Sequence, residues 1–159
     1  FPGSGRAFHV HPFHQTTGTG DTTGREAMTK ARQAVLDILM CAEEPLSAAA
    51  VQTASGNTFD PATIYRTLHY LEQKGRAESF VLHCREHGTE RYYTAAGEGE
   101  THHHWFHCEH CHRFVDLGSC GICRILGEYE KSRDIEIRSH IMYLTGICSA
   151  CKREYLQNR

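Results

Sequence analysis

Apolar side chains recur one helical turn apart in the first half of the chain. Between residues 25 and 41 the recurring positions are Met28, Ala31, Val35 and Ile38/Leu39, a spacing that predicts an amphipathic helix. A short Ala-rich helix should then open at Leu46-Ser47, with Ser47 as its N-cap. Asp60 before Pro61 marks a third helix, because a capping carboxylate followed by proline at the first helical position is a strong start signal. Gly75 is the natural left-handed cap at its end.

Strand-like segments follow this third helix. Residues 77–82 and 91–94 are predicted to be two strands joined by a polar loop, and three helices with such a hairpin make a winged helix-turn-helix. Residues 95–101 are rich in Gly and Glu and are typical of a hinge. Further elements are expected beyond it: strands at 105–108 and 114–115, a helix at 118–131, and a half-buried strand at 135–144, where polar and apolar residues alternate.

The pattern therefore predicts an α+β fold in three parts. A flexible N-terminal arm is expected at residues 1–24, a winged-helix domain at 25–95, and a small α/β domain at 96–159. Charged residues make up 23% and hydrophobic residues 40% of the 159, which is typical of a globular chain. No run of about eighteen apolar residues exists, so no membrane span is expected. The N-terminus also lacks the apolar core of a signal peptide, which favours a cytoplasmic location.

The net charge of −2 argues against a strongly basic nucleic-acid binder. Any contact with DNA must come from a local patch, duplicated by dimerisation. The best candidate is the third helix. If Ile64, Leu68 and Leu71 face the core, the side chains pointing away or to the side are Thr63, Tyr65, Arg66 and Tyr70. These groups suit phosphate and base-edge contacts in a major groove, although a merely solvated helix face remains an alternative.

Two Cys-x-x-Cys pairs, Cys108/Cys111 and Cys148/Cys151, are the strongest chemical signal. Each pair turns two sulfurs toward one point, and four thiolates make a closed tetrahedral Zn²⁺ site. Histidines precede both pairs, at 102–104 and at 140. A secreted disulfide scaffold is the less favoured alternative, because no signal peptide is evident. A zinc site pairing Cys108/Cys111 with Cys120/Cys123 also stays open, since spacing alone does not choose between them.

Several of these segments resemble the Fur family of bacterial metal-responsive repressors. Residues 62–68 match its recognition helix, A-[ST]-[VI]-Y-R-x-L, and Met28-Thr29-x-x-Arg32 is similar to its first-helix motif. The block from His102 to Cys111, with Cys148-x-x-Cys151 further on, looks like its histidine cluster and four-cysteine zinc site. The resemblance covers residues 25 to 155. It implies a winged-helix DNA-binding domain, a C-terminal dimerisation domain, and repression of metal-uptake or stress genes. Lys30 and Arg32 are further candidates for phosphate contacts.

The resemblance also implies two kinds of metal site. Cys108, Cys111, Cys148 and Cys151 would hold a structural Zn²⁺. One regulatory site would fall on His102, His104, Cys123 and His140, with Cys123 where the family usually has Glu. A soft sulfur and no carboxylate favour Zn²⁺ over Fe²⁺ there. The alternative is that Cys120-x-x-Cys123 is a free dithiol.

A second regulatory site of the family, at the junction between domains, looks damaged in this sequence. His103 is retained, but Trp105 stands in the place of the next histidine and Pro45 falls about where another ligand is usual. Possible replacements near the wing or hinge are His83, Cys84, His87, Glu98 and Glu100. The remaining histidines of the knuckle, His107, His110 and His112, are expected to flank the zinc without binding it.

The sequence thus predicts a metal-dependent, homodimeric repressor that binds a double-stranded DNA operator and controls zinc or iron uptake, and not an enzyme. One alternative is a peroxide- or redox-responsive regulator of the same fold. Another is a zinc-dependent enzyme, suggested by His107-x-Glu109 and Cys120-x-x-Cys123, although a deaminase would need proline where Ser119 stands. A zinc store without a DNA role is a third.

Overall fold

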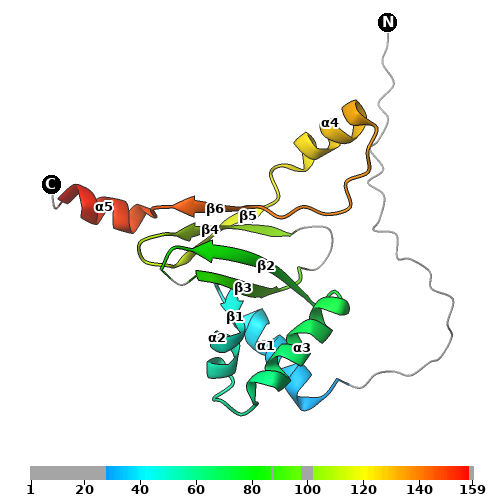
Figure 1. Cartoon of the computed structure of the whole chain (residues 1–159), viewed down its shortest axis with the longest axis vertical. Helices are drawn as coiled ribbons and strands as arrows, with labels where there is room; N and C mark the ends of the chain where they lie inside the picture. Colours follow the sequence, from blue (N-terminus) through cyan, green and yellow to red (C-terminus); the bar gives the residue numbers. More distant parts are fainter. Residues whose placement is uncertain (1–27, 87, 98–101, 158–159) are drawn as a thin grey trace, which may run out of the picture.

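Two small β-sheets lie at the centre of the molecule, with helices at its ends (Figure 1). The computed structural model describes residues 28–86, 88–97 and 102–157, with side chains described as far as residue 154. The arm expected at residues 1–24 and most of the hinge expected at 95–101 lie outside this described part, as do His87, Glu98 and Glu100.

The second and third of the three N-terminal helices begin where the capping residues predict, whereas the first, expected between residues 25 and 41, begins at Lys30. They are α1 (Lys30–Cys41), α2 (Ala48–Ala54) and α3 (Pro61–Gln73). The N-caps Thr29, Ser47 and Asp60 each accept a hydrogen bond from a backbone N–H of the first turn. Gly75 has a φ of +63°, and the next residue donates its N–H back to Leu71 O over 2.8 Å, which ends α3. The predictions for Ser47, Asp60 and Gly75 are confirmed.

The wing forms an antiparallel sheet in the order β1-β3-β2. Its strands are β1 (Leu46–Ser47), β2 (Ala77–Cys84) and β3 (Gly88–Ala95). The hairpin strands are longer than predicted because each supports the other over eight residue pairs, from Ala77↔Ala95 to Cys84↔Gly88. Strand β1, only two residues long, carries no periodic signal and was not predicted. The helices and this sheet enclose the core, whose buried members include Val35, Leu36, Leu39, Val51, Ile64, Leu68 and Leu71.

A second sheet, in the order β5-β4-β6, forms the centre of the C-terminal domain. It contains β4 (His103–Cys108), β5 (Phe114–Ser119) and β6 (Tyr143–Gly146). The strand predicted at 135–144 is wrong for most of its length. Strand β6 pairs in parallel with only the last four residues of β4, so the segment before Tyr143 has no described strand beside it to form a ladder.

Two helices extend from this sheet toward opposite ends of the molecule, α4 (Cys123–Arg133) and α5 (Ser149–Gln157) (Figure 1). The helix predicted at 118–131 begins later because Gly118 and Ser119 finish β5. Helix α5 was not predicted. None of the residues of α4 is buried, in contrast to the helices of the winged-helix domain. No described helix is both long and apolar enough to cross a membrane.

Aromatic side chains join the two domains. Phe80 of β2 lies 6.0 Å from Phe114 and 6.1 Å from Tyr143 between ring centroids, and Tyr92 of β3 lies 4.9 Å from Phe114. Glu44, just before β1, accepts a 2.9 Å hydrogen bond from the backbone N–H of Phe114. The wing sheet therefore packs directly against the C-terminal sheet, which positions the cysteines and histidines described next.

Candidate metal centres and nucleic-acid interface

Four cysteines from distant parts of the C-terminal domain meet at one point. The sulfurs of Cys108, Cys111, Cys148 and Cys151 all lie within 4.8 Å of one another. Cys108 ends β4, while Cys148 and Cys151 stand at the start of α5. The distance from Cys108 Sγ to Cys151 Sγ is 3.9 Å and that from Cys111 Sγ to Cys148 Sγ is 3.7 Å. Sulfurs of a tetrahedral zinc site lie about 3.8 Å apart, so the donor set fits Zn²⁺.

Backbone amides prepare this cluster for negative charge. Burial opposes ionisation of Cys108, but N–H groups of residues 111, 148 and 110 point at its sulfur and lower its pKa to about 6. The amide of Cys148 donates over 3.3 Å. Burial and the neighbouring sulfurs instead raise the pKa of Cys151 to about 12. Without a cation, four packed sulfurs cannot all ionise, so the charge pattern also favours a metal.

The structure brings the pair Cys148/Cys151 to Cys108/Cys111, and not the pair Cys120/Cys123. None of the eight cysteines, all of which lie in the described part of the chain, forms a disulfide. The disulfide scaffold considered above is therefore not the arrangement found.

Three histidines and one cysteine form a second cluster. The ligand atoms of His102, His104, Cys120 and His140 lie within 4.8 Å of one another. Nε2 of His140 is 2.9 Å from Nε2 of His102, 3.2 Å from Nε2 of His104 and 3.4 Å from Sγ of Cys120. In a tetrahedral zinc site, N–N and N–S separations are about 3.3 and 3.5 Å. Three imidazoles and one thiolate thus converge with the geometry of a small, closed metal site.

Cys120 takes the place predicted for Cys123. The backbone N–H of Cys120 donates to His102 O over 3.1 Å at the end of β5, which holds the Cys120 sulfur beside the histidines. Cys123 lies in the first turn of α4 and is exposed. A hydrogen bond to Cys120, together with burial, raises the pKa of Cys123. The prediction of Cys123 as the fourth member of this group is corrected, because the chain turns toward the histidines before the helix begins.

Two imidazoles of this cluster, those of His104 and His140, are favoured in the neutral form that a metal binds. Nδ1 of His104 lies 3.1 Å from the carbonyl oxygen of Met142. A carbonyl only accepts, so Nδ1 carries the proton and Nε2 presents its lone pair to the cluster. Burial lowers the pKa of His104 and, with the nearby His102 and His104, that of His140. Neutral rings are the form that coordinates a cation.

His103 points away from this group. It is exposed on β4, and its Nδ1 lies 2.7 Å from Oδ2 of Asp116 on β5. Among the described residues, no cluster of three potential ligands includes His103. Trp105 packs edge-on against Phe114, with 6.4 Å between ring centroids. The second regulatory site is thus not assembled within the described part of the chain.

A third cluster was not predicted as a group, although Cys84 is one of the possible ligands named above near the wing. Ligand atoms of Cys84, His107 and His112 lie within 4.8 Å of one another. Residue spacing gives no sign of this group, because Cys84 belongs to the wing and the histidines flank the zinc knuckle. Of the knuckle histidines expected not to bind metal, only His110 lies outside every described cluster.

Helix α3 presents the residues predicted to contact DNA. Tyr65 and Arg66 are exposed, and Thr63 is half-buried beside the N-cap. Thr63 donates to Asp60 over 2.6 Å through its hydroxyl, and Arg66 Nη2 donates to the Thr63 hydroxyl over 3.2 Å. The first turn of α3 is therefore ordered by hydrogen bonds among its own polar side chains.

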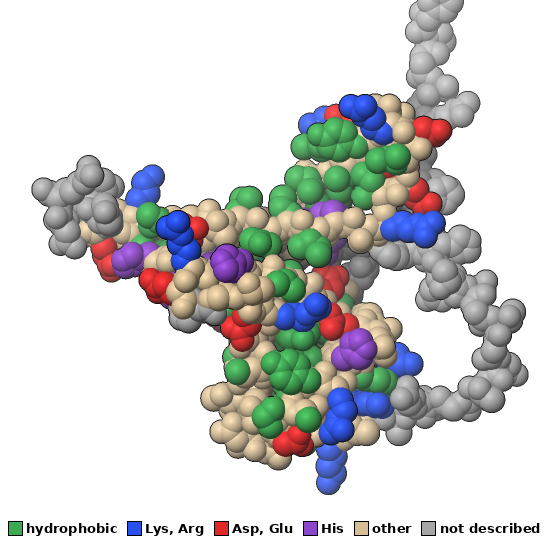
Figure 2. All heavy atoms as spheres, viewed as in Figure 1, with side chains coloured by type: hydrophobic (Ala, Val, Ile, Leu, Met, Phe, Trp, Pro, Cys, Tyr) green, Lys and Arg blue, Asp and Glu red, His purple; other side chains and the backbone are tan. Residues whose placement is uncertain are grey.

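Basic residues of α1 lie close to this face. Lys30 is exposed, and the guanidinium of Arg32 stacks on the ring of Tyr70 at 3.5 Å from its centroid. Figure 2 shows Lys and Arg side chains gathered where Figure 1 places the start of α1 and the body of α3. The chain as a whole has a net charge of −2, so these basic side chains form a local grouping and not part of a generally basic surface.

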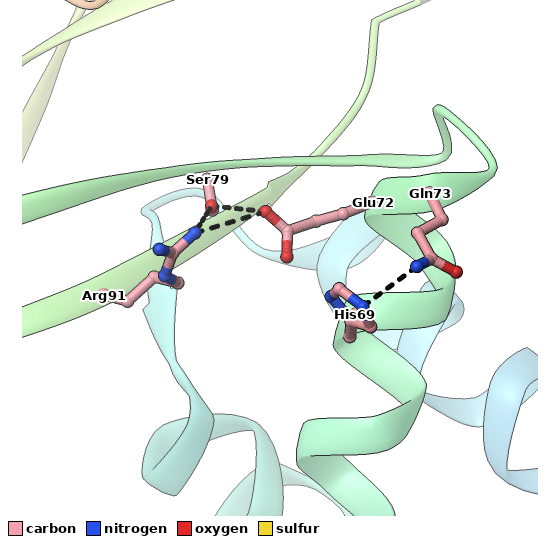
Figure 3. A network of polar contacts seen from close by, with 5 residues as sticks. All are labelled: His69, Glu72, Gln73, Ser79 and Arg91. Carbon is pink, nitrogen blue, oxygen red and sulfur yellow. Dashed lines mark hydrogen bonds and ion pairs between the residues drawn. The ribbon is translucent and has the colours of Figure 1, made fainter.

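A polar network holds α3 against the wing (Figure 3). Arg91 of β3 donates to the Ser79 hydroxyl over 2.9 Å and lies 3.6 Å from Glu72 of α3. Ser79 of β2 donates to the same Glu72 carboxylate. Within α3, Gln73 and His69 form a side-chain hydrogen bond of 2.9 Å. The helix and the wing are thereby fixed to each other.

The fold is that of a winged-helix protein whose second domain carries clustered thiols and imidazoles. A family model described as the Ferric uptake regulator family matches residues 26–145, most of the chain. The chain belongs to this family. Its fold, a winged helix followed by a dimerisation domain, agrees with the prediction. None of the curated proteins matches the chain significantly.

Solved structures of similar fold include several metal-uptake regulators. The Helicobacter pylori ferric uptake regulator, described with three functional metal-binding sites, is 24% identical over 78% of this chain and 81% of its own, with a TM-score of 0.62. The Vibrio cholerae ferric uptake regulator is 22% identical over 76% and 90%, with a TM-score of 0.57. A zinc uptake regulator complexed with zinc and DNA is 20% identical over 82% and 86%, with a TM-score of 0.58. At these identities the likeness establishes the fold.

Proposed function

We propose that this chain is a metal-dependent transcriptional repressor that binds an operator in double-stranded DNA as a homodimer. It controls genes of metal uptake in the cytoplasm, and zinc is its regulatory metal. The observation that carries the proposal is the convergence of His102, His104, Cys120 and His140 within 4.8 Å, in a chain of this family that also exposes Tyr65 and Arg66 on α3.

The donor set supports Zn²⁺ over Fe²⁺ as the regulatory ion. The cluster contains a soft thiol and three imidazoles, and it includes no carboxylate among the described residues. Because the four ligands come from the start of β4 and the residue before it, the turn after β5 and the segment before β6, joining them fixes three segments of the C-terminal domain to one another. The four-cysteine cluster binds a second Zn²⁺ permanently, and this ion holds the end of β4 to the start of α5.

The mechanism we propose is a two-state dimer. The loaded histidine cluster stabilises the arrangement in which the two α3 helices enter successive major grooves of a palindromic operator. A ligand shifts such an equilibrium only by its differential affinity for the two states, and a hundredfold preference corresponds to about 2.7 kcal/mol. Zinc scarcity empties the cluster and releases the operator, so uptake genes are expressed. Binding is the whole activity, and no enzymatic step is involved.

An exposed apolar face supports the homodimer. The exposed apolar residues of this face are Ile125 and Tyr129 of α4, Ile135 just after that helix, and Ile141, Leu144 and Ile147 in or beside β6. Figure 2 shows apolar side chains gathered over α4, which lies apart from the rest of the protein in Figure 1. Apolar surface of this kind is typical of a subunit interface. A second copy of the chain would cover it.

Operator binding with and without labile metal tests the proposal. DNA fragments are first selected from a random pool by zinc-loaded protein, and their affinity is then measured after a mild chelator removes the labile ion. We expect a loss of about a hundredfold, reversed by Zn²⁺. His140→Ala should bind weakly under both conditions, whereas His110→Ala, an exposed knuckle histidine outside the clusters, should behave as the wild type. Affinity that does not respond to the chelator contradicts the proposal.

A redox-responsive regulator of the same fold is the second candidate. One observation favours it: the Cys120 thiol lies between His140 and the neighbouring Cys123 thiol. Peroxide would oxidise the two thiols to a disulfide with release of two molecules of water, and the histidine cluster would lose its sulfur ligand. In that case peroxide should release DNA from the wild type but not from Cys123→Ser.

A further inference from the structure

The cluster of Cys84, His107 and His112 lies between the wing and the zinc knuckle. Cys84 is the last residue of β2, at the tip of the wing hairpin. His107 belongs to β4, and His112 follows the turn that contains Cys108 and Cys111. Their three ligand atoms lie within 4.8 Å of one another. The group therefore spans the two domains, and it shares no residue with the two clusters described above.

The geometry between wing and knuckle matches that of a metal site. Sγ of Cys84 lies 3.6 Å from Nδ1 of His112, close to the separation of about 3.5 Å between sulfur and nitrogen ligands of tetrahedral zinc. On the other side of the same ring, Nε2 of His112 lies 2.8 Å from Oε2 of Glu86. Because a carboxylate accepts, Nε2 carries the proton and Nδ1 faces the sulfur. A carboxylate behind the ring is the usual support of a metal-binding histidine.

The burial of the ligands and the backbone conformation of His112 also favour a metal site. Cys84 is 8% exposed and His107 is 2% exposed, so two of the donors are shielded from competing solvent. His112 has a left-handed φ of 59° and donates its N–H to Cys108 O over 2.9 Å. A residue other than glycine rarely adopts this conformation, which costs of the order of 1 kcal/mol. Here it closes the knuckle and fixes the direction of the ring that meets Cys84.

We propose that Cys84, His107 and His112 bind a third Zn²⁺ ion, with Glu86 as a positioning residue that orients His112. One thiolate and two imidazoles suit zinc better than the hard cations Mg²⁺, Ca²⁺ or Mn²⁺. A water molecule completes the tetrahedron. The bound ion ties the wing tip to the structural zinc knuckle of the same chain, and it does so whether or not the chain is a repressor.

Zinc stoichiometry tests this site. Full-length protein is dialysed against excess Zn²⁺, washed of free ion, and its zinc content per chain is measured. Cys84 is the position to change, because His107 and His112 adjoin ligands of the four-cysteine cluster. We expect Cys84→Ser to hold one Zn²⁺ fewer than the wild type and Cys84→His, which supplies another ligand, to regain it. His83→Gln, the exposed neighbour, should lose none.

A second measurement separates loss of the site from misfolding. In the wild type, Zn²⁺ should slow alkylation of the Cys84 thiol, followed by mass spectrometry, at least tenfold relative to chelated protein. His112→Asn removes the imidazole, and asparagine tolerates the left-handed backbone. In this variant the alkylation rate of Cys84 should no longer respond to zinc. Glu86→Gln should weaken zinc binding at this site by about tenfold and leave the other ions in place.

Two results would overturn the inference: an unchanged zinc content in Cys84→Ser, or alkylation of Cys84 that ignores zinc in the wild type. His140→Ala serves as the reference for the proposed regulatory site. It should lose a different zinc and keep the zinc-dependent protection of Cys84. Failure of the repressor proposal, seen as absence of DNA binding, would leave both readouts of this third site unaffected.

Discussion

Cys120 and Cys123 stand three residues apart, yet only Cys120 lies with the three histidines. The difference arises from one backbone hydrogen bond, in which the N–H of Cys120 donates to His102 O and extends the contact between β5 and β4. Single atoms also decide the state of the histidines, since the carbonyl of Met142 fixes which nitrogen of His104 is free to bind a metal. At this scale, metal binding depends on whether the Cys120 sulfur and the free ring nitrogen of His104 face the same point.

Arg66 gives the most direct test of the DNA-binding face. It is exposed, and its described side-chain contact is with Thr63 on the same helix. Arg66→Ala should therefore leave folding, zinc content and dimerisation unchanged and abolish operator binding, measured by a DNA shift assay. Arg138→Ala, an exposed arginine of the C-terminal domain, is the matched control. Operator affinity that survives in Arg66→Ala would mean that α3 is not the recognition helix.

Serine variants of Cys148 and Cys123 test which cysteine pair completes the structural zinc site with Cys108/Cys111. Cys148→Ser should lose the tightly held Zn²⁺ and destabilise the C-terminal domain severely, because such a site contributes on the order of 10 kcal/mol. Cys123→Ser should keep both zinc and stability. Zinc content after dialysis and thermal unfolding measure the outcome, and the reverse result would support the pairing with Cys120/Cys123.

At the scale of elements, helix α3 is the part on which most constraints converge. Asp60 caps its start, Ile64, Leu68 and Leu71 anchor one face in the core, and Gly75 ends it. The network of Glu72, Ser79 and Arg91 then fixes its last turn to the wing (Figure 3). Since helix and wing are held as one unit, both would approach DNA in a fixed relation. Helix α4 has no such anchoring within the described chain.

Replacing Gly75 or Gly127 by alanine should change the stability of the protein in opposite directions. A Cβ at Gly75 or at Gly127 would meet no atom within 4 Å, but Gly75 has a φ of +63° whereas Gly127 lies within α4. Gly75→Ala should therefore destabilise the protein by about 1 kcal/mol, because the left-handed backbone disfavours a side chain. Gly127→Ala should stabilise α4 by roughly 0.5–1 kcal/mol. Urea unfolding of both variants checks the signs, and equal effects would contradict this account of α3 termination.

At the scale of the whole molecule, the C-terminal domain is incomplete on its own. None of the residues of α4 is buried, and β6 has a described neighbour on one side only. The winged-helix domain, by contrast, encloses its own core. The unevenness is explained if a second copy of the chain covers α4 and the apolar residues around β6. In that arrangement a partner copy would stabilise the C-terminal half, whereas the winged-helix half is stabilised by its own core.

Ile141 tests that interface. Ile141 is 73% exposed in the single chain, so each chain of Ile141→Glu should still fold. In the dimer the new carboxylate would be buried, and it should weaken dimerisation by at least about tenfold. Met40→Glu, at a similarly exposed apolar position on α1 with 65% exposure, should leave dimerisation intact. Sedimentation equilibrium measures both. A dimer of unchanged affinity in Ile141→Glu would place the interface elsewhere.

Local sequence determined the elements whose signals lie within one or two helical turns. The caps at Ser47 and Asp60, the left-handed Gly75 and the apolar stripe of α3 were all predicted, because each hydrogen bond or contact involves neighbours in the chain. The four-cysteine group was also foreseen, although spacing alone left its pairing open. The strand at 135–144 failed for the opposite reason, since a strand exists only where another strand pairs with it.

Residue types and their local order therefore determined which chemistry this chain carries, namely thiols and imidazoles in the segment that follows the winged helix. Only the tertiary structure decided which of them meet. The pairing of β4 with β5 and β6 brought Cys120 and His140 to His102 and His104, and the packing of the wing on the C-terminal sheet brought Cys84 to His107 and His112. Ligand groups form by contacts between residues far apart in sequence, and such distances are set by packing rather than by spacing along the chain.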